Sequence, residues 1–340
     1  MELKGQLTSK SHTTISTIRP GSRYHDLLTK FPGLTKPRQA PTIKPYGVYH
    51  HIHTKGPPDA QPFRRLPPEK LKIAKMEFAH LIEAGICRPS SSPWAALLHL
   101  VPKKMTRVWR PCGDYRGLNA ATTPDKYPLP HISDFAHGLY GKNIFSTLDL
   151  EKAYYHIPVA EEDVQKTAVI TPFGLFEFTA MPFGLKNAAQ TFQRFMNSIF
   201  QSLDYVYCYV DDILIASETH EKHLQHLQDV FKRLQTAGVT VNASKCVFGE
   251  EQVDFLGYRI SGQGIKPLPD KVEVITNYPK PKTIIELRRF LGMLNYYRRC
   301  IKNAAHDQAV LNDYLKDSKK NDKRPIVWTS QANEAFDKCI

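Results

Sequence analysis

The sequence lacks any long uninterrupted apolar run. Its longest apolar stretch, within residues 205–216, is broken by two adjacent aspartates. A membrane-spanning helix needs about 20 mostly apolar residues, so none is expected. The N-terminus has no apolar core of signal-peptide length either, and secretion is not expected.

Cysteine motifs are also missing. The six cysteines form no CxxC pair and no cluster with zinc-ligand spacing. This pattern indicates reduced thiols in an intracellular protein. They stand at Cys87, Cys112, Cys208, Cys246, Cys300 and Cys339.

Positive charge is in excess: 46 basic residues face 33 acidic ones, which gives a net charge of +13. Such a surplus favours a polyanionic partner, because each neutralised phosphate releases a counterion. A basic, solvated surface with no special partner is the alternative. The 41% hydrophobic content over 340 residues predicts a globular chain of one to three domains.

The order of elements predicts an α+β fold with antiparallel strands and helices packed on one face. Residues 1–60 are rich in Thr, Ser, Pro and Lys and are expected to be poorly ordered. Within them, alternation over 46–53 favours a strand over a histidine metal site. Helices are predicted over 68–84, 187–203, 219–237, 284–299 and 330–340; strands over 143–150, 253–260 and 326–328; and pairs of strands over 167–178 and 205–216.

Three aspartates form the most informative pattern. Asp211 and Asp212 lie at the tip of the predicted 205–216 hairpin, and Asp149 ends the predicted strand 144–149. Asp is common in tight turns, so two solvated acids are one interpretation. Two adjacent carboxylates repel each other, however, and a divalent cation would neutralise them. If the strands are neighbours, the three side chains would converge on Mg²⁺.

A series of motifs in fixed order makes the chain resemble the reverse transcriptase of gypsy-class LTR retrotransposons, from the Pol polyprotein. The resemblance runs from about residue 62 to the C-terminus. The motifs are LPPEK (66–70), GICRPSSSPW (85–94), VPKK (101–104), WRPCGDYRGLN (109–119), TPFGLFEF (171–178), MPFGLKNA (181–188), YVDD (209–212), FLGY (255–258) and LRRFLGMLNYYRR (287–299).

The resemblance implies a right-hand polymerase with fingers, a palm containing a ferredoxin-like antiparallel sheet, and a thumb. The expected ranges are 61–123 and 159–181 for the fingers, 124–158 and 182–262 for the palm, and 263–325 for the thumb, with the reverse transcriptase domain at about 85–262. Residues 326–340 would begin a truncated linker toward an absent RNase H domain. Motifs of a protease, a zinc knuckle and an integrase are also missing.

The resemblance further implies RNA-directed DNA polymerase (nucleotidyltransferase) activity with two Mg²⁺ ions, for which Mn²⁺ could substitute. Asp149 and Asp211 would be the main ligands, Asp212 a supporting carboxylate, and the Leu150 carbonyl a further ligand. Lys245 would protonate pyrophosphate; an exposed salt-bridging lysine is the alternative.

Other implied roles concern substrates. Tyr154 would be the steric gate against ribonucleotides, unless it is a core tyrosine. The remaining dNTP contacts would be Lys103, Lys104, Arg110, Phe183 and Gly184. The primer grip would be Leu256, Gly257 and Tyr258, and the template–primer backbone would meet Arg288, Arg289, Arg298 and Arg299.

The implied partners are an RNA template, a DNA primer, dNTPs and other Pol or Gag parts, in a cytoplasmic particle or the nucleus. A catalytically inactive nucleic-acid-binding remnant is the alternative function; an RNA-dependent RNA polymerase is disfavoured by YVDD and the aromatic gate. Four positions depart from the family pattern: Tyr155 replaces His, His156 replaces Gln, and Gly113 and Gly117 replace bulkier residues.

Overall fold

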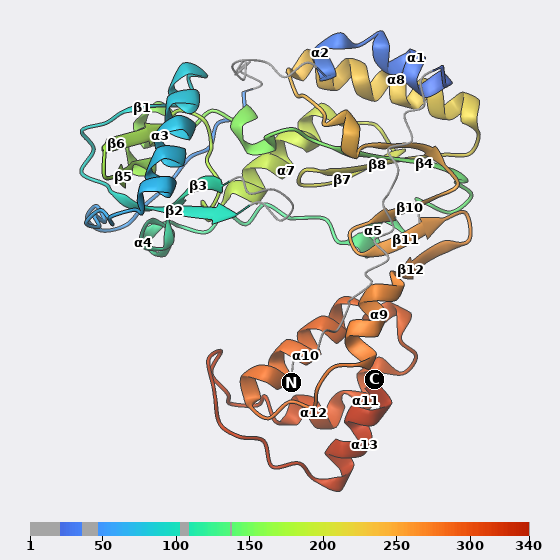
Figure 1. Cartoon of the computed structure of the whole chain (residues 1–340). Coiled ribbons are helices and arrows are strands. Elements are labelled where there is room, and N and C mark those ends of the chain that lie inside the picture. Colours follow the sequence, from blue (N-terminus) through green and yellow to red (C-terminus); the bar gives the residue numbers. More distant parts are fainter. Residues whose placement is uncertain (1–20, 36–46, 103–108, 137, 340) are drawn as a thin grey trace, which may run out of the picture. The chain divides into compact units, whose positions relative to one another are not determined.

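The computed structural model describes residues 21–35, 47–102, 109–136 and 138–339 (Figure 1). The chain divides into two compact units, residues 1–251 and 252–340. The elements of the first unit are α1 (Arg23–Thr29), α2 (Pro32–Thr35), α3 (Pro68–Glu83), β1 (Cys87–Pro89), β2 (Ala96–Pro102), β3 (Trp109–Asp114), α4 (Arg116–Ala121), α5 (Ile132–Phe135), β4 (Ile144–Asp149), η1 (Ala153–His156), α6 (Glu161–Val164), η2 (Gln165–Thr167), β5 (Val169–Thr171), β6 (Gly174–Phe178), α7 (Ala188–Ile199), β7 (Val206–Tyr209), β8 (Asp212–Ser217), α8 (His220–Ala237), η3 (Ala243–Lys245) and β9 (Val247–Glu250).

One sheet of this unit has five strands in the order β1-β6-β5-β2-β3. Only the β2–β5 pairing is parallel. Helix α3 packs on it through Phe78, whose ring lies 5.0 Å from that of Phe176. The helix begins at the predicted Pro-Pro pair, and Gly85 follows its end with φ +68, a conformation that suits glycine.

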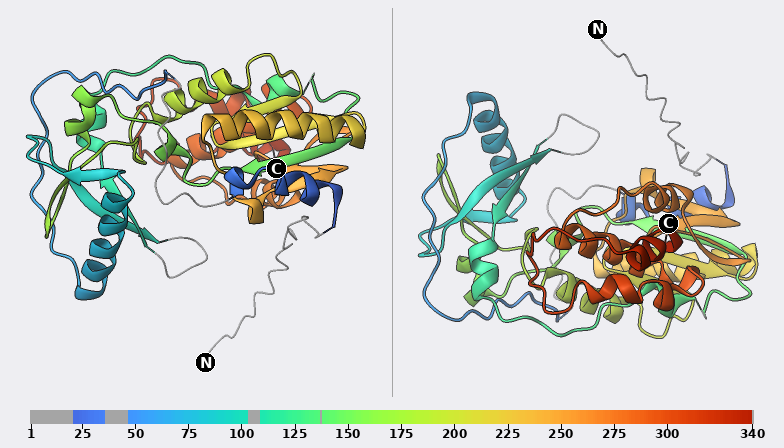
Figure 2. Two further views of the ribbon diagram at one scale, coloured as in Figure 1. Left: turned by 90° about the horizontal axis from the view of Figure 1, so that it is seen from above. Right: turned by 90° about the horizontal axis from the view of Figure 1, so that it is seen from below.

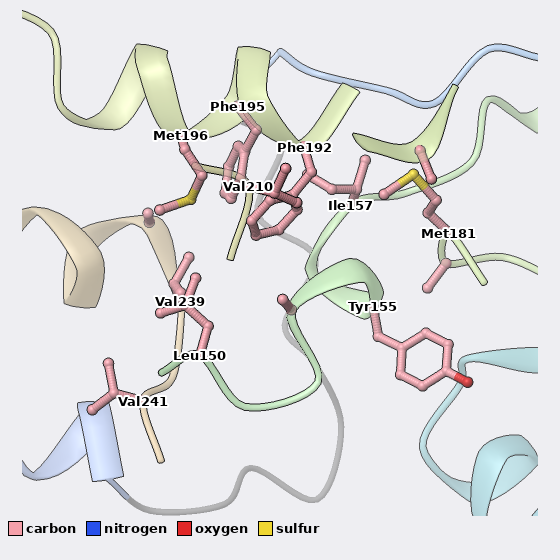
Figure 3. Close-up of a cluster of buried hydrophobic side chains, with 14 of the residues drawn as sticks. Leu150, Tyr155, Ile157, Met181, Phe192, Phe195, Met196, Val210, Val239 and Val241 are labelled. Carbon is pink, nitrogen blue, oxygen red and sulfur yellow. The ribbon is translucent and has the colours of Figure 1, made fainter. Parts of the chain in front are cut away.

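The other sheet is antiparallel and has four strands in the order β7-β8-β4-β9. Helices α7 and α8 match the predicted 187–203 and 219–237, and Gly238 ends α8 with φ +75. The inward side of α7 carries Phe192, Phe195 and Met196, which Figure 3 shows packed around Val210. This core therefore lies directly beneath the predicted aspartate hairpin.

The prediction of a poorly ordered N-terminal extension is wrong for residues 21–35. Helices α1 and α2 lie along α8, as Figure 1 and the view from above in Figure 2 show. Tyr24, Leu27, Leu28 and Leu34 are buried there. Composition misled the prediction because a few apolar residues suffice when a neighbouring helix offers a complementary surface.

The predicted strand over 46–53 is also wrong for the part that the structure describes. Residues 47–53 form only an isolated bridge, between His50 and Val159. The alternation is nevertheless real: His50 is buried, whereas His51 and His53 are exposed and their rings stack at 5.8 Å.

The second unit contains a three-stranded antiparallel sheet, β10-β11-β12, and a helical part. A core of Leu287, Phe290, Leu291, Leu294, Leu311, Ala332, Ala335, Phe336 and Cys339 holds the helices together. The elements are β10 (Gln252–Phe255), β11 (Tyr258–Ser261), β12 (Gly264–Pro267), α9 (Pro269–Thr276), α10 (Ile284–Tyr296), η4 (Arg298–Cys300), α11 (Ala304–Asp307), α12 (Ala309–Asp313) and α13 (Ser330–Cys339).

Two predictions fail in this unit. The strand over 253–260 is a hairpin, because the chain turns at Leu256-Gly257. Residues 326–328 form no strand; only Pro325 bridges to Thr283. Helix α13 shares its core with α10, while the assignment of residues 326–340 to the start of a linker stays a prediction.

Other sequence predictions can be compared with the described residues. The α+β class is confirmed. All six cysteines lie in the described part and are unbridged. Among the described helices, none combines the length and the apolar character needed to cross a bilayer.

Candidate catalytic site

The site is built on the central strands of the four-stranded sheet. Strand β4 ends at Asp149, and β8 begins at Asp212, its direct cross-strand partner. Opposite residues of an antiparallel pair present their side chains on the same face. Asp211 occupies the turn just before β8. The sheet register therefore brings Asp149 next to the Asp211–Asp212 pair, although they are far apart along the chain.

The turn that presents Asp211 has an unusual backbone. Val210 has φ +54, a region that β-branched residues rarely adopt. Its N–H donates to Gln193 Oε1 at 2.8 Å, and Gln193 Nε2 donates to the Cys208 carbonyl at 3.0 Å. Gln193 is fully buried on α7, so the helix holds both sides of the turn.

The charges of the three aspartates act on one another. Loss of hydration around its carboxyl, followed by repulsion from Asp211 and Asp149, raises the pKa of Asp212 to about 6. Lys245, at the end of η3, offsets part of this charge. Its Nζ lies 3.3 Å from both carboxylate oxygens of Asp149.

These donors suit a hard divalent cation. Mg²⁺ takes carboxylate and carbonyl oxygens and completes its shell with water and substrate phosphates. The oxygens of Asp149, Asp211 and Asp212 do not all lie within 4.8 Å of one another, so they form an open set rather than a closed cage. The backbone carbonyl of Leu150 follows Asp149, while the Leu150 side chain is buried near Val239 and Val241 (Figure 3).

A different group does meet that distance among the described residues: His51, Glu162 and Asp163. Its buried carboxylate is already satisfied. Asp163 bonds Lys166 Nζ at 2.6 Å and accepts the Ile52 N–H at 2.8 Å. A neutralised carboxylate is a poor metal ligand, and sequence reasoning gave this group no role.

The backbone on each side of Leu150, directly after Asp149, is held by residues 240–242. Asn242 N–H donates to the Asp149 carbonyl at 2.8 Å, and Glu151 N–H donates to the Thr240 carbonyl at 2.9 Å. Lys245 N–H in turn donates to the Asn242 carbonyl at 3.0 Å. One short segment therefore fixes both Asp149 and the lysine that pairs with it.

Aromatic rings lie next to the aspartates. Tyr154, on η1, has ring centroids 5.1 Å from Phe183 and 5.5 Å from Phe192. Burial first, and then the charge of Asp211, raise the pKa of Tyr154 to about 12. Gly184 has φ +96, and its carbonyl accepts from Asn119 Nδ2 at 2.8 Å. Tyr154 and Phe183 thus lie together, with Asp211 close enough to affect the tyrosine.

The departures from the family pattern have local explanations. A Cβ at position 113 would lie 2.5 Å from the ring of the buried Tyr115, and one at 117 would lie 1.9 Å from Asp59 Oδ2. The buried Tyr115 ring therefore favours glycine at 113, whereas at 117 a larger residue would require the Asp59 carboxylate to move. Tyr155 is buried in the same hydrophobic core as Phe192, and its ring packs edge-on against Phe183 at 5.9 Å.

Three residues predicted to contact the dNTP fall wholly or partly outside the described structure. Lys103 and Lys104 lie outside the described residues, as does the side chain of Arg110, whose backbone belongs to β3. Leu256 and Gly257 form the β10–β11 turn of the second unit, and Tyr258 is the first residue of β11.

The arginines of the second unit differ from one another. Arg289 is exposed on α10, but Arg288 donates through Nη2 to the Ser318 carbonyl at 3.2 Å. Arg298 and Arg299 are exposed in η4, after the helix that was predicted to carry them. Arg288 is therefore already engaged inside its own unit.

Sequence reasoning missed Gln193 and the 240–242 segment. Gln193 had a signal, because it is a polar residue next to Phe192 on the inward side of an apolar helix face. Residues 240–242 had none, since their role depends on backbone hydrogen bonds.

The sequence is similar to a protein family and to several known proteins. Residues 101–260 match the family model described as "Reverse transcriptase (RNA-dependent DNA polymerase)". The chain is 38% identical over 264 residues to the retrovirus-related Pol polyprotein from transposon 297 of Drosophila melanogaster, covering 76% of this chain and 25% of that protein. It is 37% identical over 280 residues to the transposon Tf2-3 polyprotein of Schizosaccharomyces pombe, covering 81% and 21%. The chain thus spans about a quarter of the length of the curated relatives it matches.

Solved structures share the fold. The foamy viral protease–reverse transcriptase in complex with double-stranded DNA matches with a TM-score of 0.77 and 23% identity, covering 92% of this chain and 55% of that chain. The same viral protein in complex with an RNA/DNA hybrid matches with a TM-score of 0.72, covering 93% and 42%. The predicted right-hand polymerase fold is confirmed.

Proposed function

Because this chain belongs to the reverse transcriptases of retrotransposon Pol polyproteins, we propose that it is an RNA-directed DNA polymerase. It would join a deoxynucleotide from a dNTP to a primer 3′ hydroxyl, on an RNA or DNA template. The observation that carries the proposal is the cross-strand pair of Asp149 and Asp212 with Asp211 at the adjoining turn. Membership of the gypsy class stays a prediction.

Asp149 and Asp211 would be the main metal ligands, with Asp212 and the Leu150 carbonyl in support. When bound, two Mg²⁺ ions (or Mn²⁺ in their place) would activate the 3′ hydroxyl and neutralise the leaving pyrophosphate. Lys245 would give a proton to that pyrophosphate; its pairing with Asp149 also fits the alternative of an exposed salt-bridging lysine.

The ring of Tyr154 would lie under the sugar of the incoming nucleotide and exclude a 2′ hydroxyl. Phe183, whose ring packs against it, and Gly184 would line the same pocket. The guanidinium of Arg110 would bind the triphosphate, since its planar donors match phosphate oxygens. Lys103 and Lys104 would assist.

Template and primer would be held mainly through their backbones, with little sequence preference. Leu256, Gly257 and Tyr258 would grip the primer, and Arg289, Arg298 and Arg299 would contact phosphates. Arg288 is a weaker candidate because its guanidinium donates to Ser318. Other parts of the polyprotein are proposed partners.

A primer-extension assay tests the proposal. The full chain is supplied with poly(rA)/oligo(dT), Mg²⁺ and labelled dTTP. We expect extension, and a loss of at least about a thousandfold in Asp211→Asn, because metal charge stabilisation is worth several kcal/mol. The matched control is Asp204→Asn, the same change at an exposed aspartate outside the site. Absence of extension, or extension that survives Asp211→Asn, contradicts the proposal; duplex binding without extension would support an inactive remnant.

The gate has its own experiment. Tyr154→Ala should admit ribonucleotides, measured as the ratio of kcat/KM for UTP to that for dTTP. Tyr140→Ala, the same change at an exposed tyrosine outside the site, is the control. Unchanged discrimination in Tyr154→Ala would refute the assignment.

A further inference from the structure

The helices α1 and α2 precede the region that matches the reverse transcriptase family model, which begins at residue 101. They nevertheless pack on α8, the helix that contacts the four-stranded sheet. Leu34 is fully buried, and Phe31 packs edge-on against Phe231 of α8 at 5.7 Å. The side chain of Leu34 is therefore part of the hydrophobic core, while its carbonyl is bonded to Val241.

The backbone of Leu34 is bonded to the segment that holds Asp149. Val241 N–H donates to the Leu34 carbonyl at 2.8 Å. On its other edge, Val241 forms an antiparallel bridge with Leu150, whose flanking bonds run from Asn242 to Asp149 and from Glu151 to Thr240. Residues 240–242 therefore lie between two neighbours: the Leu34 carbonyl of helix α2 on one side, and residues 149–151 on the other.

The same N-terminal segment also contacts β9. The ring of Tyr24 covers Gly249, where a Cβ would lie 2.1 Å from it, and it stacks with Phe248 at 6.4 Å. Strand β9 pairs with β4 at Thr147 and Val247, two residues before Asp149. Tyr24 and Leu34 thus support the sequence on both sides of η3, the turn that carries Lys245.

We propose that residues 21–35 are a positioning element for Asp149 and Lys245, with Leu34 as its main anchor. This rests on the proposed function of these two residues. The physical reason is that the segment 240–242 has no helix or sheet of its own; its geometry is set by the neighbours on its two edges. If the Leu34 side chain is truncated, α2 loses its buried anchor, and the Leu34 carbonyl is held less firmly against Val241, next to the Asn242 N–H that bonds the Asp149 carbonyl.

The experiment measures metal binding directly, in the full chain, by titrating Mn²⁺ and following the free ion by electron paramagnetic resonance. Leu34→Ala should weaken Mn²⁺ binding about tenfold, as expected when a residue that orients a metal ligand is removed. Leu34→Met, which keeps the volume, should restore it. Leu81→Ala is the matched control, since Leu81 is a buried leucine of α3 on the five-stranded sheet's side.

The outcomes separate positioning from stability. Equal Mn²⁺ affinity in Leu34→Ala and Leu81→Ala, at temperatures where both are folded, would overturn the proposal. If Leu34→Ala does not fold, Leu34→Val gives the same comparison with a smaller truncation. A separate variant tests the proposed function of Asp149 itself. Mn²⁺ binding that is unaffected by Asp149→Asn would show that Asp149 is not a metal ligand, whatever the result for Leu34.

Discussion

Two tight turns, one in each unit, each place an aliphatic residue at positive φ but support it in different ways. Each joins two antiparallel strands through two residues, and each begins with a bulky aliphatic residue at positive φ: Val210 at +54 and Leu256 at +49. In the second turn Gly257 follows at φ +81, where glycine is favoured. In the first, Asp211 follows instead.

The supports of the two turns differ as well. Val210 is buried, and its N–H is bonded to the buried Gln193. The turn at Leu256 is held from the surface, where the exposed Tyr296 donates from its hydroxyl to the Leu256 carbonyl at 2.7 Å. A buried support costs more to remove, because water cannot replace it. We therefore expect the Asp211 turn to be rigid and the Leu256 turn to be adjustable.

Among the changes that compare the two turns, the largest effect should come from Gln193→Leu. This change leaves the Val210 N–H and the Cys208 carbonyl without their partner, and each such group costs about 1–3 kcal/mol. A small displacement of Asp211 should lower kcat about a hundredfold. The measurement is single-turnover extension at saturating dTTP. The control is Asn197→Ala, which removes another partner of Gln193 but leaves the bond to Val210; an unchanged kcat in Gln193→Leu would mean that the turn needs no such support.

The next effect is on pH dependence. The pKa of Asp212 in the folded protein, about 6, lies above the ordinary value of 3.8. The folded state therefore binds more protons than the unfolded state between about pH 4 and 6, and this contribution to stability is lost as pH rises through that window. Asp212→Asn should raise the Tm of the metal-free protein at pH 7 and leave it nearly unchanged at pH 4. Thermal unfolding in EDTA from pH 4 to 8 measures this.

The second hairpin supplies the control for that prediction. Asp254 lies on β10 and is paired with Arg259, whose Nε lies 2.9 Å from its Oδ1. Asp254→Asn removes an attraction rather than a repulsion, so it should not raise the Tm at pH 7. A similar rise in both variants would show that general surface charge, rather than the aspartate cluster, is responsible.

A smaller effect separates the two residues at positive φ. Asn tolerates this conformation and Asn-Gly is a preferred two-residue turn, so Leu256→Asn should stabilise the chain by about 0.5–1 kcal/mol. Val210→Asn should destabilise it by about 1–3 kcal/mol, because it places a polar group among Phe192 and Phe195. Urea unfolding measures both. The same sign of change in the two variants would contradict the contrast.

The smallest effect is expected for Tyr296→Phe. The lost bond to the Leu256 carbonyl is exposed, and water can replace it, so the free energy of unfolding should fall by about 0.5 kcal/mol or less. Urea unfolding alongside Gln193→Leu gives the comparison. A loss as large as that of Gln193→Leu would show that the second turn is as dependent on its support as the first.

Local patterns predicted much of the fold because they report interactions between near neighbours. The apolar period of α7 and α8, the glycines after α3 and α8, and the two arms of the β7–β8 hairpin are all such cases. The failures occurred where a distant partner decides. The order of residues 21–35 depends on α8, and the turn at Leu256 that divides 253–260 is held by the distant Tyr296.

The sequence by itself determined which groups are proposed to carry the chemistry: three aspartates, a lysine and an aromatic residue in an ordered set of motifs. Only the tertiary structure decided how they are held. Asp149 faces Asp212 through the register of β4 and β8, Gln193 fixes Val210 from another element, and Leu34 reaches Asp149 through Val241. The physical reason is that these supports are backbone hydrogen bonds and buried contacts between segments far apart in the chain, and such contacts leave little trace in composition or spacing.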